Sequence, residues 1–169
     1  MIQDQKDNTV GEYFKASKIL FGAFILGVIN FGIVLIVLFF LDMIPLGDLD
    51  ESFTIYFILG SLALFILMSF VGNTVFKSKT ESITQELSLA KKLAVYRESK
   101  LIQAVTLEAS ALCAMVFIML TSHIFFVVIA LISLVQMIRV FPKKTEMIAT
   151  LDLSYSEQHK LNNPDTLLS

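Results

Sequence analysis

The 169-residue sequence is poor in residues on which many catalytic and disulfide-stabilised proteins depend: it has one cysteine, two histidines and no tryptophan. The single cysteine, Cys113, excludes an intrachain disulfide and a cysteine-based zinc site. Neither a nucleophilic serine with a matching histidine and acid nor a glycine-rich phosphate loop can be recognised. We therefore expect no catalytic residues, no metal site and no cofactor.

Charge is scarce as well. Charged residues make up 17% of the chain and hydrophobic residues 56%, whereas soluble proteins average about 25% charged residues. This composition is the reverse of the one that produces disorder. A net charge of −2 offers no basic face for nucleic acid. The composition predicts a membrane protein whose first partner is the lipid bilayer and which binds no nucleic acid.

The hydrophobic residues are concentrated in four long runs. A helix needs about 20 apolar residues to cross about 30 Å of hydrocarbon. The qualifying runs cover approximately residues 19–41, 53–76, 101–120 and 124–141. The turn between the last two is so short that these spans must form a tight hairpin. We expect an all-α polytopic membrane protein with four transmembrane helices arranged as two antiparallel hairpins.

The basic residues predict how these helices are oriented. All 13 lie in the N-terminal tail 1–18, in the loop 77–100 or at the C-terminal end from Arg139 onward. Positive charge is retained on the cytoplasmic side of short loops, so both termini are expected in the cytoplasm. The first apolar run is too long for a signal peptide, whose core has about 7–15 residues. The expected organisation is a tail 1–18, a transmembrane domain 19–141 and a C-terminal tail 142–169.

The loop between spans two and three is expected to form a cytoplasmic helix, 78–100, that continues into span three. Apolar residues recur in it at helical spacing, and Ser78 with Glu81 could form a capping box. The candidate partner or lipid surface consists of Ile83, Leu87, Lys91, Lys92 and Arg97. It could dock a protein or anionic lipid, or it could be an orientation signal on a helix that lies against its own bundle.

The C-terminal tail is expected to contribute little structure. Pro142 cannot continue a helix without loss of a hydrogen bond, and the residues after it are mostly polar. Ser154 and Glu157 could cap one turn of helix, which Asn162 and Pro164 would end. The last residues are predicted to fray.

Polar residues inside the spans are the candidate functional residues. Glu108 is the only acid within any span, and an ionisable residue in hydrocarbon suggests function by default. The candidate intramembrane polar cluster is Glu108, Asn73, Gln136, Arg139 and Gln103. One interpretation is a hydrogen-bonded clip that holds the helices in register. The other is a carboxylate that accepts a proton or binds a cation during transport.

Two resemblances bear on the C-terminal half. The residues from Tyr96 through span three with its central Glu108, then the segment from Phe141 to Ser154, resemble small, uncharacterised four-helix proteins of the bacterial inner membrane. This resemblance implies that location and carries over no activity. Residues 101–120 are also similar to the proton-carrying helix of rotary ATPase ring subunits. The glycine-rich first helix and polar loop of those subunits are missing here.

Three classes of function remain open. A non-enzymatic structural or accessory component of a membrane complex explains the small loops and the missing catalytic residues. A small proton- or cation-coupled transporter, working as a homo-oligomer, explains Glu108. A membrane-embedded enzyme would have to rely on Glu108, Gln103 and Arg139. We expect the first of these and no enzymatic activity.

Overall fold

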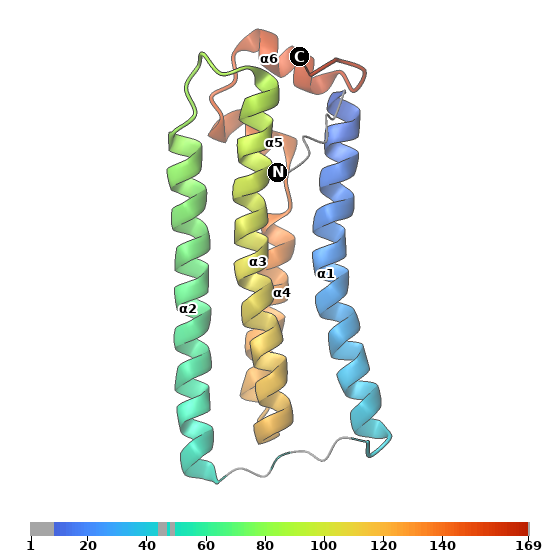
Figure 1. The fold of residues 1–169 in the computed structure, drawn as a ribbon, viewed down its shortest axis with the longest axis vertical. Coiled ribbons are helices and arrows are strands. Elements are labelled where there is room, and N and C mark those ends of the chain that lie inside the picture. Colours follow the sequence, from blue (N-terminus) through green and yellow to red (C-terminus); the bar gives the residue numbers. More distant parts are fainter. Residues whose placement is uncertain (1–8, 44–46, 48–49, 169) are drawn as a thin grey trace, which may run out of the picture.

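The computed structural model describes residues 9–43, 47 and 50–168 (Figure 1). Within these residues the fold is all-α, with six helices and no strand. The helices are α1 (Val10–Phe40), α2 (Glu51–Glu81), α3 (Leu89–Thr121), α4 (Phe125–Val140), α5 (Lys144–Thr150) and α6 (Tyr155–Asn162).

By length and composition, α1, α2 and α3 can each cross a membrane. α4 has 16 residues, and it counts as a fourth candidate span only together with α5, to which it is bent by 73°. The bend occurs at Pro142, which cannot donate a backbone hydrogen bond. The expected all-α class is confirmed for the described residues, and three or four of the helices there are long and apolar enough to span a membrane.

α3 is the centre of the bundle. α1 and α2 flank it on opposite sides, and α4 runs alongside it (Figure 1). Buried Val28, Leu107 and Met137 form one cluster that joins α1, α3 and α4. Ala114 and Phe126 belong to a second cluster between α3 and α4. α3 reverses into α4 through a tight turn, where Ser122 has a left-handed backbone with φ of 56°.

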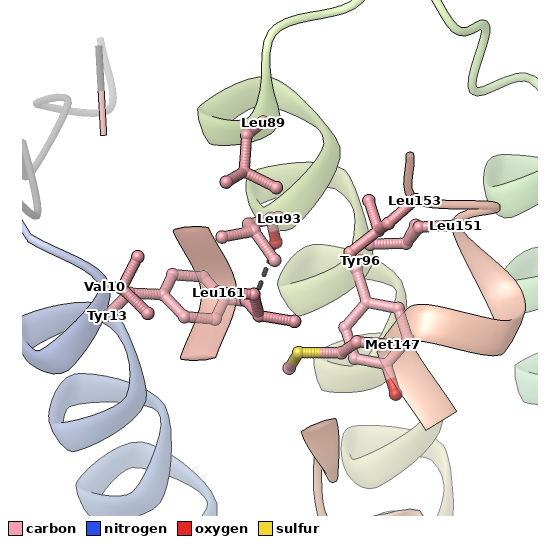
Figure 2. Close-up of a cluster of buried hydrophobic side chains, with 9 residues drawn as sticks. All are labelled: Val10, Tyr13, Leu89, Leu93, Tyr96, Met147, Leu151, Leu153 and Leu161. Atoms are coloured by element: carbon pink, nitrogen blue, oxygen red, sulfur yellow. Dashed lines mark hydrogen bonds between the residues drawn. The ribbon is translucent and has the colours of Figure 1, made fainter. Parts of the chain in front are cut away.

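A third cluster closes the end of the bundle that carries α5 and α6 (Figure 2). It draws its side chains from α1, from the start of α3 and from the C-terminal segment: Val10, Tyr13, Leu89, Leu93, Tyr96, Met147, Leu151, Leu153 and Leu161. The Tyr13 hydroxyl donates a hydrogen bond of 2.8 Å to the Leu93 carbonyl. We call residues 142–168, which cover this end, the C-terminal cap.

The prediction that the last residues fray is wrong for those that the structure describes, which end at Leu168. The backbone N–H of Val10 donates to the Thr166 carbonyl at 3.0 Å, and that of Gly11 donates to the Pro164 carbonyl at 2.9 Å. The tail is polar on average, but its few apolar side chains meet in one cluster and are buried there. The predicted cap at Ser154 is confirmed, because Ser154 and Glu157 form a capping box at the start of α6.

Two predicted boundaries also change. α1 begins at Val10, inside the expected tail 1–18, because Thr9 and Glu12 form a capping box there; residues 1–8 lie outside the described part. The predicted helix 78–100 is interrupted, since α2 runs on to Glu81 and α3 starts only at Leu89. α2 and α3 pack side by side, so the chain must reverse between them, and it does so at 82–88.

Candidate functional site

The structure brings together three of the five residues of the predicted intramembrane cluster. The Gln103 amide nitrogen on α3 donates a hydrogen bond of 2.8 Å to the Asn73 side-chain oxygen on α2. Gly72 lets the two helices approach, because a Cβ atom there would lie 2.6 Å from the Thr106 hydroxyl. Gln136 of α4 lines the same small space. Asn73 and Gln103, with Gln136 beside them, form a hydrogen-bonded clip between α2 and α3, which is smaller than the predicted one because that included Glu108 and Arg139.

A polar cavity of about 30 Å³ lies within this clip, lined by Ser69, Asn73, Gln103 and Gln136 among others. The Ser69 hydroxyl and the side-chain oxygen of Gln103 are buried, and no described residue forms a hydrogen bond with either. A polar cavity needs at least about 10–15 Å³ to hold a water molecule. The cavity therefore has room for a water that could satisfy these two oxygens.

Glu108 is not part of this clip. Its carboxylate faces α1, where a Cβ atom on Gly27 would lie 3.7 Å from Glu108 Oε1. The reason is helical geometry: Glu108 follows Gln103 by five residues, which at about 100° per residue places it about 140° around the helix axis. Arg139 is exposed near the end of α4. The structure therefore separates Glu108 and Arg139 from the other three residues of the predicted cluster.

Glu108 is partly buried, and the residue that it faces on α1 is exposed. Its side chain is half-buried, whereas Gly27 opposite is exposed. Among the described residues, none forms a hydrogen bond or an ion pair with the Glu108 carboxylate. The carboxylate is thus open to a molecule that approaches along the contact between α1 and α3.

An apolar groove of about 450 Å³ lies between α1, α3 and α4. It extends along α1 from Val28 to Phe39, and Met115 of α3 and Leu134 of α4 form part of its walls. Ser122 contributes the one polar side chain of this lining. Sequence reasoning missed the groove because three separate helices form it, and no local pattern records how far α1 stands from the other two.

The candidate partner surface proves to be occupied largely by the chain itself. Lys92 is 1% exposed, and its ammonium group lies 2.8 Å from Glu157 Oε1 of α6. The Arg97 guanidinium lies over the Tyr13 ring, 5.1 Å from its centre. Ile83 packs against the cluster under the C-terminal cap.

Of the remaining two residues of that surface, Leu87 is half-buried and Lys91 is exposed. Lys100 of α3 is hydrogen-bonded to Glu146 of α5, and its ammonium group lies 4.5 Å from the centre of the Phe76 ring. Acidic residues of the C-terminal cap therefore neutralise two of the bases on α3.

Electrostatics favour the ionised form of Glu157 in the cap. Partial burial acts to raise the pKa of Glu157, but hydrogen bonds from Lys92 and Ser154 outweigh it and hold the pKa below its usual value. Glu157 is therefore ionised at neutral pH and paired with the buried Lys92. The cap is held by an ion pair as well as by apolar contact.

The described part of the chain contains no group of three or more His, Cys, Asp or Glu side chains that could hold a metal ion. Cys113 is a free, half-buried thiol. No protein-family model, curated protein or solved structure matches this chain.

Proposed function

We propose that this chain is a non-enzymatic integral membrane protein that binds a proton or a cation at Glu108, as a small carrier does. The observation that supports this proposal best is that the Glu108 carboxylate faces Gly27 of α1, away from the hydrogen-bonded clip. The hydrogen bond between Asn73 and Gln103 supports a structural role for these two residues. Glu108 makes no such contact with any described residue.

Energetics strengthen this reasoning. An ionised side chain in the centre of a membrane helix costs about 2.5–3.5 kcal/mol on insertion scales. Such residues usually pair with another group or line a path for ions, and Glu108 has no pairing group among the described residues. A bound proton or cation would remove the charge and with it most of this cost.

Infrared difference spectroscopy on the reconstituted protein tests the proposal, because it distinguishes a protonated from an ionised carboxyl group. We expect a carboxyl band that responds to pH and to added sodium, potassium or ammonium, and that is lost in Glu108→Gln. Glu81→Gln is the matched control, since Glu81 is exposed and pairs with Lys77 on the same helix. If wild type and Glu108→Gln give the same spectra at every pH and with every cation, the proposal is wrong.

A second candidate function is that of an accessory component of a membrane complex. The observation that favours it is the outer surface of α2, where large apolar side chains such as Tyr56 and Phe70 are 72% and 67% exposed. In a bilayer such a surface contacts lipid or a helix of another protein. Purification from native membranes in mild detergent, with mass analysis, tests this. A stoichiometric partner would support the accessory role, and a homo-oligomer alone would support the carrier.

A further inference from the structure

We infer that the molecule bound at Glu108 is a single-chain amphiphile with a protonated amine, whose ammonium group meets the carboxylate while its chain fills the groove between α1, α3 and α4. This inference rests on the proposed function, because it assigns a ligand class to the same carboxylate. It adds the groove to the binding site.

The carboxylate and the groove lie along one contact between α1 and α3. Gly27 of α1 faces Glu108 of α3, and further along the same contact Gly32 faces Met115. A Cβ atom on Gly32 would lie 3.4 Å from the Met115 methyl group. Met115 follows Glu108 by seven residues, which is about two helical turns and about 10 Å. Gly32 and Met115 line the groove. The groove therefore begins within about two turns of the carboxylate.

The shape of the groove suits an extended chain. Its wall on α1 runs from Val28 to Phe39, which is about 16 Å at 1.5 Å per residue. Its volume of about 450 Å³ falls within the range of about 300–1,000 Å³ that ligand pockets occupy. Gly32 keeps the wall open at the point where Met115 approaches. A linear alkyl chain can fill such a groove along its length.

The charge of the head group follows from Glu108. Lipid tails are as apolar as the side chains of the groove, so the groove alone cannot select a ligand from the bilayer. Selection has to come from the carboxylate, which favours a cation and repels a phosphate. An ammonium group also donates the hydrogen bonds that a carboxylate accepts. The exposed Gly27 leaves room for this head group beside Glu108.

Isothermal titration of the protein in lipid nanodiscs, with empty nanodiscs subtracted, tests the inference. The probes are dodecylammonium, dodecanol as the neutral molecule of equal chain length, and butylammonium as the short amine. We expect saturable binding of dodecylammonium, with affinity at least tenfold lower for dodecanol and for butylammonium. Glu108→Gln should lower the dodecylammonium affinity at least tenfold as well.

Variants of two glycines separate the groove from the carboxylate. Gly32→Leu should weaken dodecylammonium binding at least tenfold and leave the infrared response of Glu108 to protons and small cations intact. Gly32→Ala, a smaller change, should have a smaller effect in the same direction. Gly60→Leu on α2 is the control, because a Cβ atom at Gly60 meets nothing within 4 Å. It should bind dodecylammonium as wild type does.

The outcomes also distinguish the two proposals. Equal affinity for dodecanol and dodecylammonium would overturn the amphiphile inference, and so would an unchanged dodecylammonium affinity in Gly32→Leu. In either case, an infrared response of Glu108 to pH and cations would still support the proposed function. Bound phospholipid that dodecylammonium does not displace would overturn the amphiphile inference too. An infrared spectrum that is insensitive to pH and cations would overturn both.

Discussion

The ion pair between Lys92 and Glu157 allows a quantitative test of how the C-terminal cap is held. The side chains of Lys92 and Glu157 are 2% and 17% exposed, so solvent screens the pair only weakly. Removing one partner of a buried ion pair leaves an uncompensated charge and costs about 3–5 kcal/mol. Glu157→Gln should therefore open the cap in a much larger fraction of molecules, because the buried ammonium group of Lys92 would lose its partner.

Amide hydrogen exchange in nanodiscs measures this opening directly. Since about 1.4 kcal/mol corresponds to a factor of ten, protection of the α6 amides should fall by at least about 100-fold in Glu157→Gln. Replacing both partners, as in Lys92→Met with Glu157→Gln, should restore most of the protection, because the buried methionine leaves no unpaired ammonium group. In the exposed pair of Lys77 and Glu81, Glu81→Gln should cost less than about 1 kcal/mol.

Two results would refute this reasoning. If Glu157→Gln left the α6 amides as protected as in wild type, the ion pair would not hold the cap. If the double variant were as open as the single one, the loss would come from Glu157 itself, for example from its capping box with Ser154, and not from the stranded lysine.

Three further predictions follow from other contacts. The pKa of Glu157 is lower in the folded protein than in the unfolded chain, so its contribution to stability is complete above the unfolded pKa of about 4.3 and is lost as the pH falls through the folded pKa. Limited proteolysis of the cap should therefore accelerate as the pH falls through this range. The acceleration should be smaller in Glu157→Gln, which lacks the titrating carboxyl group. Gly72→Ala should lower the melting temperature in detergent, because its Cβ atom would lie 2.6 Å from a facing hydroxyl of α3, whereas Gly60→Ala should not. Asn73→Leu removes the hydrogen bond to Gln103 and should cost less than about 1 kcal/mol of unfolding free energy, since such bonds between membrane helices average about 0.6 kcal/mol; a cost of several kcal/mol in a detergent unfolding titration would contradict this.

Apolar run length predicted the helices well. The expected span 101–120 lies within α3, and 53–76 lies within α2. Run length succeeds because a membrane helix satisfies its backbone internally, so its existence depends on local hydropathy. Run length cannot predict where a helix ends outside the bilayer, and there α2 and α3 both extend beyond their expected spans.

The candidate site was predicted only in part. Polarity within apolar spans was enough to select Asn73, Gln103 and Gln136, which the structure brings together. Polarity alone does not say on which side of α3 a residue points, so Glu108 was grouped with them. Glu108 follows Gln103 by five residues, which places the two side chains on different faces of α3. The sequence does not show which helix packs against each face, so it could not separate their neighbours.

The sequence by itself determined the all-α class, the approximate helix positions and the gathering of basic residues in three segments, because these depend on runs of local composition. Only the tertiary structure decided that the C-terminal segment caps the bundle, that Lys92 is buried against Glu157, and that Glu108 faces α1 near one end of an apolar groove. These features depend on which faces of distant segments meet. That is decided by packing between segments, which no single stretch of the chain encodes.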